Sequence, residues 1–279
     1  MIELITDSTS DISPALAEQL GVRVLPLSVH FGDESFRDGL DITNADFYAR
    51  LRAAETLPTT SQINPEVFAD AFQEAIDRGN QVVGIFVSSE LSGTFQSAVI
   101  ARGMVDEENV FAVDSRGIAF SLSLLVVEAA RMRDAGFGAA EIAQEIERLR
   151  GKLRLYAVVD TLKYLKMGGR ISAATAVVGG VLGISPIIAL EEGKVASVGK
   201  ARGRKAGVKW IRDRAEEEEI DLSRPVAIGH TDCQEAMDAV EAVFADMLEC
   251  VPAVYRGEIG AVVGTHAGPG AAGIGYFVK

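Results

Sequence analysis

The sequence predicts an α/β protein whose N-terminal part forms a parallel, doubly wound sheet. Short apolar runs alternate with amphipathic stretches, and this pairing occurs three times in the first half: 2–5 then 14–20, 81–87 then 91–104, and 110–113 then 118–133. Such alternation is typical of crossover units, in which a helix returns the chain to the next parallel strand. With 279 residues, 48% of them hydrophobic, the chain is long enough to form two domains.

The pattern changes near Gly151. A helix over 138–150 ends there in basic residues, and strand-like segments follow over 152–160, 183–190 and 193–200, the last two joined by a turn at "EEG". The chain then continues with a charged helix over 203–219, a strand over 224–230, a helix over 233–247 and a glycine-rich end. We therefore expect an N-terminal α/β domain over 1–151 and a C-terminal α/β domain with a mixed open sheet over 152–279.

Composition and charge argue against several classes of partner. The net charge of −13 opposes binding to nucleic acid and to anionic membrane surfaces, because both require a positive field. Two cysteines, Cys233 and Cys250, are too few for a disulfide scaffold or a four-ligand zinc site. The N-terminus shows no secretory pattern, and no apolar run approaches a membrane span. We expect a cytoplasmic protein without metal, nucleic-acid partner or stable membrane insertion.

Four polar, turn-rich segments are candidates for a binding site: "ITDSTSDISP", "LPTTSQINP", "SSELSGTFQSA" and "GTHAGPG". The first and third follow parallel strands, so both lie at the carboxyl edge of the sheet, where doubly wound proteins bind ligands. Helix capping explains single serines such as Ser13, Ser89 or Ser92. It does not explain the hydroxyls at 59–61, because Asn64 already provides a cap for the next helix. These surplus hydroxyls predict a ligand.

His266 differs from the other histidines because it lies in a glycine-rich loop, where the backbone can approach a ligand closely. We expect His30 and His230 to be structural. The basic run "KARGRKAGVK" opens a helix whose other end is acidic, an order that opposes the helix dipole. A solvated face with tolerated charge pairs and a positive patch for an anionic partner explain this run equally well.

Seven segments occur in one order through nearly the whole chain: "ITDSTSDISP", "VLPLSVHFGDESFRDGLDITNADFY", "TTSQINPEVF", "SSELSGTFQSA", "VVDTLKYLKMGGRIS", "GISPIIALEEGKVASVGKARGRK" and "GTHAGPGAAGIGYF". Together they resemble the DegV family, whose characterised members include the FakB fatty-acid-binding proteins of bacteria. The resemblance implies a two-domain α/β protein that encloses one long-chain fatty acid, with the acyl tail in an apolar tunnel and the carboxyl group near the domain interface. It further implies a non-catalytic carrier, which presents the carboxyl group to a separate fatty-acid kinase subunit for acyl phosphate formation.

The resemblance also implies which residues bind the carboxyl group. Thr60 of "TTSQ" and Ser92 of "LSGT" match hydroxyls that hydrogen-bond it, and Ser61, Gly93 and His266 lie beside them. The helix after "LSG" adds backbone N–H groups and a favourable dipole. The expected ligand is the fatty acid itself, and no catalytic residue, metal or cofactor is implied.

Two basic residues, Arg170 of "GGRIS" and Arg202 of "KARGRK", match positions near the phosphoryl group or the kinase surface. Two other functions use the same site. One is a serine hydrolase of lipid esters with Ser92 as nucleophile and His266 as base, although "SELSGT" lacks the outer glycines of a nucleophile elbow. The other is a sensor whose bound lipid switches a partner.

Overall fold

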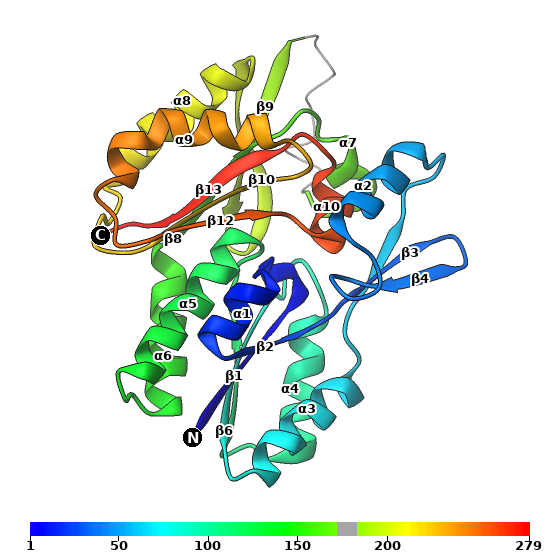
Figure 1. Ribbon diagram of the computed structural model, residues 1–279, viewed down its shortest axis with the longest axis vertical. Coiled ribbons are helices and arrows are strands. Elements are labelled where there is room, and N and C mark those ends of the chain that lie inside the picture. The colour runs from blue at the N-terminus through cyan, green and yellow to red at the C-terminus, as the bar shows by residue number, and fades with distance from the viewer. Residues whose placement is uncertain (172–182) are drawn as a thin grey trace.

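The computed structural model describes residues 1–171 and 183–279. Ser172, the last residue of the "GGRIS" motif, lies outside the described residues. The described chain forms three sheets with helices packed on them (Figure 1). The α/β class predicted from the sequence is confirmed.

The N-terminal sheet is parallel, with the strand order β2-β1-β6-β7. Its strands are β1 (Ile2–Asp7), β2 (Val22–Leu25), β6 (Gln81–Phe86) and β7 (Val110–Asp114). Its helices are α1 (Pro14–Leu20), α3 (Pro65–Asp77), α4 (Thr94–Val105), α5 (Phe120–Asp134) and α6 (Ala139–Leu149). In β1, Leu4 packs toward α5 and α6 and Ile5 toward α3 and α4, because successive strand side chains point to opposite faces (Figure 1). The predicted doubly wound sheet is confirmed.

The C-terminal sheet is mixed, with the strand order β10-β9-β8-β13-β11-β12. Its strands are β8 (Leu153–Val158), β9 (Ile184–Glu191), β10 (Lys194–Arg202), β11 (Val226–His230), β12 (Val254–Glu258) and β13 (Ala272–Phe277). The β11–β12 pair is parallel, whereas β13 runs antiparallel to both β8 and β11. Helices α8 (Arg204–Glu217) and α9 (Gln234–Leu248) cover the outer face. The predicted mixed open sheet is confirmed.

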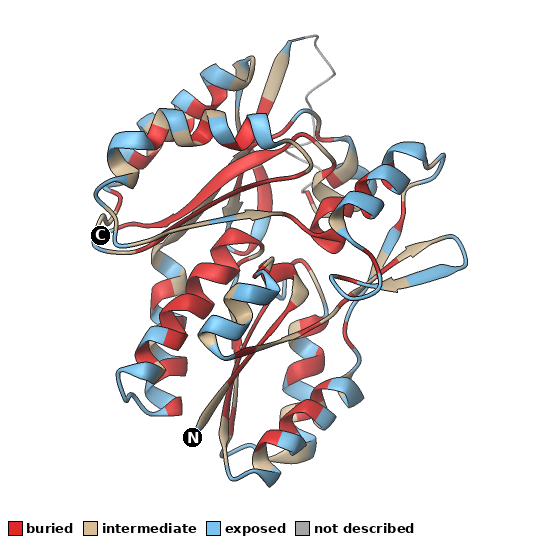
Figure 2. Ribbon diagram, viewed as in Figure 1, coloured by how far each residue is buried: buried red, intermediate tan, exposed pale blue. Residues whose placement is uncertain are grey.

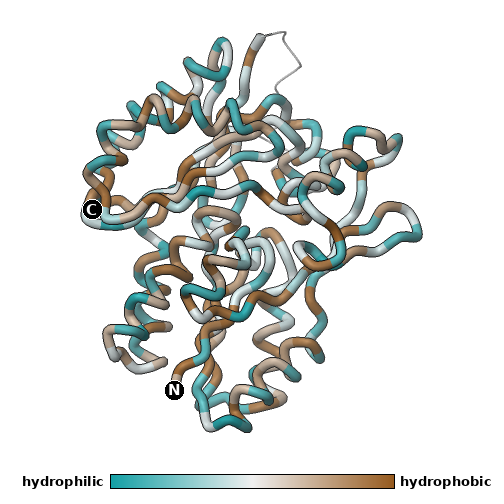
Figure 3. The backbone as a smooth tube through the Cα atoms, in the orientation of Figure 1, coloured by the Kyte–Doolittle hydropathy of each residue, from teal (hydrophilic) through white to brown (hydrophobic). Residues whose placement is uncertain are grey.

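A third, small sheet lacks a clear signal in the sequence. Its strands β3 (Ser28–Phe31), β4 (Glu34–Arg37) and β5 (Thr59–Ser61) have the order β4-β3-β5 and are only three or four residues long. They lie beside α2 (Asn44–Ala53), α7 (Lys163–Met167) and α10 (Ala261–Ala267). Two short 3-10 turns, Ser8–Ser10 and Arg150–Lys152, lie outside this small sheet. The tip of the β3–β4 hairpin is hydrophilic (Figure 3). Such short, polar strands show too little alternation to be recognised.

Helix α5 is buried on almost all sides (Figure 2). It contacts β1 and β6 of the parallel sheet as well as β8, β11 and β13 of the mixed sheet. A helix that is apolar all round is one that packs against protein on more than one side. Helix α5 is therefore a wall common to both large sheets, and its first turn lies in the space between them.

The turn before α4 differs from the prediction. The helix begins at Thr94, later than expected, because the chain first makes a turn in which the Ser92 amide donates to the Ser88 carbonyl at 3.1 Å. Ser89 does not cap the helix, since its hydroxyl donates to Asp114 at 2.6 Å. The Ser92 hydroxyl accepts from the Thr94 amide at 3.2 Å.

Other local expectations can be compared with the structure. Ser13 caps α1, because its Oγ accepts from the Leu16 amide at 3.2 Å. The turn between β9 and β10 is formed by Glu192 and Gly193, both with positive φ, as in the favoured two-residue hairpin turns. Asn64 occupies the N-cap position of α3 but its side chain makes no capping bond.

Candidate functional site

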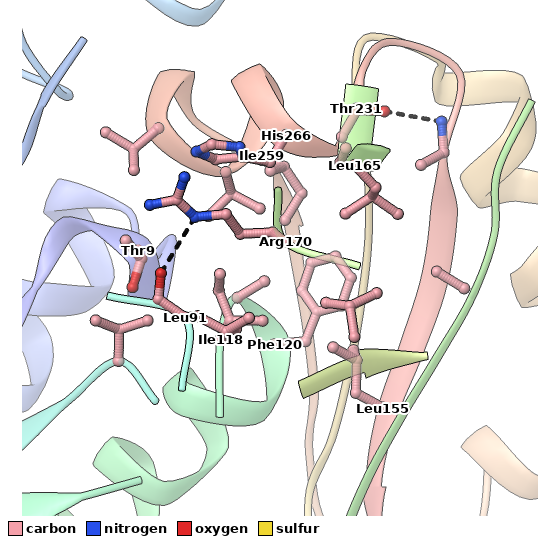
Figure 4. Close-up of a pocket in the computed structure, with 18 of the residues that line it drawn as sticks. Thr9, Leu91, Ile118, Phe120, Leu155, Leu165, Arg170, Thr231, Ile259 and His266 are labelled. Atoms are coloured by element: carbon pink, nitrogen blue, oxygen red, sulfur yellow. Dashed lines mark hydrogen bonds between the residues drawn. The ribbon is translucent and has the colours of Figure 1, made fainter. Parts of the chain in front are cut away.

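A cavity of about 360 Å³ lies between the inner face of the C-terminal sheet, the first turn of α5 and the loops that follow β1 and β6 (Figure 4). Small-molecule sites typically measure roughly 300–1,000 Å³. One end of this cavity is apolar and the other carries hydroxyl, amide and charged side chains. We call the apolar end the floor and the polar end the mouth.

The floor is formed by alternate residues of the C-terminal sheet and by α5. Its main members are Ile118, Phe120, Leu155, Ala157, Ile188, Val195, Gly229 and Gly273. Gly229 of β11 and Gly273 of β13 are direct cross-strand partners. A Cβ at Gly229 would collide with the Phe120 ring, and a Cβ at Gly273 would collide with the Tyr156 carbonyl. Glycine at 229 therefore allows the Phe120 side chain of α5 to pack close to the sheet, and glycine at 273 allows close approach of the neighbouring strand β8.

The mouth is formed by four segments far apart in sequence. Its members are Thr60, Ser61, Gln62, Ser92, Gly93, Arg170 and His266. The Thr60 Oγ1 and His266 Nε2 atoms are 3.0 Å apart, so one hydrogen bond joins β5 to α10. Arg170 donates from Nη1 to the Gly168 carbonyl at 2.7 Å and from Nε to the Leu91 carbonyl at 3.3 Å (Figure 4). These backbone bonds hold the guanidinium beside the imidazole.

The His266 side chain is neutral at physiological pH. Burial, and then the nearby positive charge of Arg170, lower the pKa of His266 to about 4. Its Nδ1 atom is buried and has no hydrogen-bond partner among the described residues. A Cβ at Gly168 would collide with this atom, so the absence of a side chain there leaves room for the ring.

Helix α10 places His266 at the mouth, which corrects the prediction that this histidine lies in a loop. The amide of Gly260 donates to Asp11 at 2.8 Å and the amide of Ala261 donates to Asp38 at 2.9 Å, so two carboxyl groups hold the start of the helix. Burial raises the pKa of both carboxyl groups. Gly264 lies inside this helix, and a Cβ there would lie 2.6 Å from the Tyr48 hydroxyl, so glycine at this position makes room for Tyr48.

The loops after β1 and β6 meet at one edge of the parallel sheet, as predicted. Asp7 at the end of β1 accepts from the Val87 amide at 2.8 Å and from the amide and hydroxyl of Thr9 at 3.0 and 2.6 Å. Burial raises the pKa of Asp7 to about 6. Thr9 from one loop and Leu91 from the other both line the cavity.

Helix α4 begins at the mouth, where its N-cap residue lines the cavity. Gly93 is its N-cap residue, and a Cβ there would collide with the Gln62 side chain. Gln62 in turn donates from Nε2 to the Ser97 hydroxyl at 2.9 Å. The Ser92 hydroxyl lies 2.9 Å from Thr94 Oγ1. Helix N-termini of this kind favour anionic ligands because unpaired N–H groups and the helix dipole act together.

Of the seven residues selected from the sequence, six line the cavity: Thr60, Ser61, Ser92, Gly93, Arg170 and His266. Arg202 does not line it and is exposed at the end of β10. Its neighbour Arg204 instead makes an internal contact, donating to Asp160 at 2.7 Å.

Several lining residues were not selected from the sequence. His230, expected to be structural, borders the cavity while its Nδ1 accepts from the Cys233 amide at 3.0 Å. Gln62 belongs to the "TTSQ" motif, so its position next to Thr60 was an available signal. Thr9 also lines the cavity and belongs to the candidate segment "ITDSTSDISP", whereas Thr231 lies outside the four candidate segments.

Ser92 and His266 do not form the serine–histidine pair that the hydrolase hypothesis requires, although Ser61 bonds to His30 at 2.9 Å. Nε2 of His266 bonds to Thr60, and the Ser92 hydroxyl bonds to Thr94. In the parts of the chain that the structure describes, no three His, Cys, Asp or Glu side chains are grouped so as to hold a metal ion. No helix over the same residues has the length and apolarity needed to cross a bilayer.

An α/β protein with an apolar cavity between two sheets and a polar mouth at one end is the class that the fold and the site define. The chain belongs to the DegV family: the family model, which describes uncharacterised proteins of that family, matches residues 1–279. The agreement extends over the whole chain, as the order of the sequence motifs suggested.

Individual relatives agree with this assignment. A DegV domain-containing protein from Caldanaerobacter subterraneus is 38% identical over 279 residues, covering 100% of this chain and 99% of its own. A fatty-acid-binding DegV family protein from Thermus thermophilus superposes with a TM-score of 0.92 at 33% identity. The match covers 100% of this chain and 99% of the Thermus protein. A stearic-acid-binding protein from Eubacterium ventriosum superposes with a TM-score of 0.90 at 28% identity. The match covers 100% of this chain and 99% of the Eubacterium protein.

Proposed function

We propose that this protein binds one long-chain fatty acid without covalent attachment, with the acyl tail on the floor and the carboxylate at the mouth. The observation that carries the proposal is the polarity of the cavity, which is apolar along the sheet and ends at Thr60, Ser92, Arg170 and His266. The fatty-acid-binding relatives from Thermus thermophilus and Eubacterium ventriosum support the same ligand class.

The acyl tail supplies most of the affinity. Burial of a methylene group contributes about 0.8 kcal/mol, so about fourteen methylenes contribute about 11 kcal/mol before the costs of association and ordering. The Phe120 ring packs over Gly229, so the proposed tail lies beside this ring on the floor.

The mouth supplies the specificity for an acid group. A carboxylate that accepts from Thr60, Ser92 and Arg170 gains charge-assisted hydrogen bonds, each worth about 1.5–3 kcal/mol. His266 is neutral and offers a ring nitrogen without adding charge. A bound carboxylate opposes the effect of the Arg170 charge on the imidazole, so ligand binding raises the pKa of His266 above its low value in the free protein.

We propose further that the protein is a cytoplasmic, non-catalytic carrier with an N-terminal domain over 1–151 and a C-terminal domain over 152–279, and that it presents its ligand to a separate fatty-acid kinase. The kinase transfers a phosphoryl group from ATP to the carboxylate, giving an acyl phosphate and ADP. In this proposal Arg170, which lines the mouth, pairs with the new phosphate, and the exposed Arg202 contacts the kinase.

The ligand proposal is tested by solvent extraction of the gently purified protein and mass spectrometry. The expected result is close to one acyl chain per protein chain. If the extract contains no acyl chain and the protein also fails to bind added palmitate or oleate in a calorimetric titration, the ligand proposal is wrong.

The kinase proposal is tested separately. A kinase candidate retained on the immobilised protein, together with ATP-dependent acyl phosphate trapped by hydroxylamine, supports the carrier function. Lipid binding with a lipid-dependent partner that forms no acyl phosphate supports a sensor instead. Labelling of Ser92 by a fluorophosphonate, together with turnover of a lipid ester, would support the serine hydrolase function instead of the carrier function.

A further inference from the structure

A second hollow, of about 390 Å³, lies beyond the floor at one end of the C-terminal sheet. Residues of both faces line it, because Arg154 and Tyr156 of β8 point to the face opposite to the floor. On β9, Ile188 lines the first cavity and Leu190 lines the second. On β8, Ala157 lines the first and Leu153 the second, whereas Leu155 lines both. These residues alternate by two along their strands, so all of them point to the same face.

Neighbouring residues at the start of α5 and around the start of β10 also divide between the two hollows. At the start of α5, Phe120 faces the first cavity and Ser121 the second. Val195 of β10 lines the first, and Gly193 of the preceding turn lines the second. Of the described lining residues, Leu155 is the one that the two hollows share. Leu155 therefore lies at the boundary between them.

The two hollows differ in chemistry. The second is lined by arginines and glutamates, among them Arg154 and Glu218, whose charged atoms are 3.7 Å apart. The Tyr156 hydroxyl donates to the same glutamate at 2.8 Å. An alkyl chain that enters this hollow removes water from charged groups without offering hydrogen bonds, which is unfavourable.

Leu155 also lies at the end of the cavity away from the mouth. In Figure 4, Arg170 and His266 lie together at one side, whereas Leu155 lies at the other, beyond Ile118 and Phe120. A tail that starts at the mouth and follows the floor thus meets Leu155 last.

We propose that Leu155 closes the acyl cavity and sets the longest chain that the protein accepts, an inference that rests on the proposed fatty-acid function. The accepted class is then a chain with an apolar methyl end that stops at Leu155. Removing this side chain joins the floor to the polar hollow, which admits longer chains and favours those that end in a polar group.

The experiment measures affinities for a ladder of saturated fatty acids from lauric to behenic acid, by competition with a fluorescent fatty acid, on the delipidated full-length protein. We expect the affinity of the wild type to rise along the ladder and then to fall. In Leu155→Ala the fall moves to longer chains, each admitted methylene adding about fourfold in affinity. Leu155→Phe moves it to shorter chains. In Leu155→Ala an ω-hydroxy chain beyond the wild-type limit binds more tightly than the plain chain of equal length.

The matched control is Leu165→Ala, because Leu165 is a buried leucine that lines the first cavity but not the second. It should weaken all chain lengths alike and leave the position of the fall unchanged. If the wild type binds no member of the ladder, the proposed function itself fails. If the wild type binds but the fall stays in place in both Leu155 variants, or moves equally in Leu165→Ala, the role of Leu155 is refuted.

Discussion

The two ends of the cavity are built in opposite ways. The mouth is formed by loops and helix ends from four parts of the chain, and its groups are held by individual bonds such as the one between Thr60 and His266. The floor is formed by alternate residues of one sheet, and its shape depends on strand register and on glycines such as Gly229. The comparison shows that substitutions at the mouth should change single interactions, whereas substitutions at the floor should change the space itself.

The largest effect is expected for Gly229→Val at the floor. The new side chain would collide with the Phe120 ring and with the Gly257 carbonyl, a backbone atom that cannot move aside easily. We expect a loss of about 3 kcal/mol in the free energy of unfolding and the loss of acyl binding. Chemical denaturation and fatty-acid titration measure the two effects.

Gly151→Val is the control for this substitution, because a Cβ at Gly151 has no neighbour within 4 Å. Its unfolding free energy should change by no more than about 0.5 kcal/mol. Equal losses for both variants would mean that the floor is not constrained as described.

The next effect concerns pH and belongs to Asp7, at the end of β1 and bonded to the cavity-lining Thr9. Burial raises the pKa of Asp7 from 3.8 to about 6, so the folded protein binds this proton more tightly than the unfolded chain does. The resulting stability is fully present below pH 3.8 and is lost as the pH rises through about 6. The full loss amounts to up to about 3 kcal/mol.

Asp7→Asn isolates this contribution. The stability difference between wild type and variant should shift by up to about 3 kcal/mol in favour of the variant from pH 4 to pH 7, as measured by urea denaturation at each pH. A difference that stays constant across this range would contradict the burial of an ionisable Asp7. The floor has no comparable titrating group among the residues named for it.

A smaller effect is expected for Ser92→Ala at the mouth. Loss of one hydroxyl from the carboxylate should weaken fatty-acid binding by about 1–3 kcal/mol, because its partner is left without a hydrogen bond. Ser89→Ala is the control, since Ser89 lies in the same loop but bonds to Asp114 and does not line the cavity. Calorimetry with palmitate and with its methyl ester should show the difference for the acid alone. An equal loss for the ester would place the ligand head group elsewhere.

The smallest effect is expected for Arg202, one of the two arginines selected from the sequence. Arg202→Ala should leave the affinity for palmitate unchanged to within about 0.5 kcal/mol, because the side chain lies outside the cavity. Arg170→Ala should reduce it, by about 1.5–3 kcal/mol. A similar loss for both would show that Arg202 reaches the ligand.

The mouth was largely recognisable in the sequence, because its residues sit in short contiguous motifs such as "TTSQ" and "LSGT". The location of His266 in a helix was not recognisable, since the glycines around it suggest a loop. The glycine inside the helix, Gly264, is explained by the packing of Tyr48, which the sequence does not show. Likewise, the sequence predicts the same kind of role for Arg170 and Arg202. The fold brings Arg170 to the mouth and leaves Arg202 exposed at the end of β10.

The floor was not recognisable at the level of residues. Leu155, Ile188 and Val195 are ordinary apolar residues, and their meeting depends on the strand order β10-β9-β8. The parallel sheet was predictable because each strand and helix has a local periodicity of sufficient length. The small sheet with β3, β4 and β5 was not, because its strands are too short for a periodicity to develop.

The burial of α5 between the two large sheets has a consequence for ligand exchange. Moving the sheets apart would expose one of the most apolar surfaces of the protein, including Leu122, Leu124 and Leu125, to water. A fatty acid held as proposed is therefore expected to leave along its own length, with the carboxyl group passing first through the mouth and the two sheets staying in place. Its release rate should then depend on the loops at the mouth rather than on any hinge between the two halves.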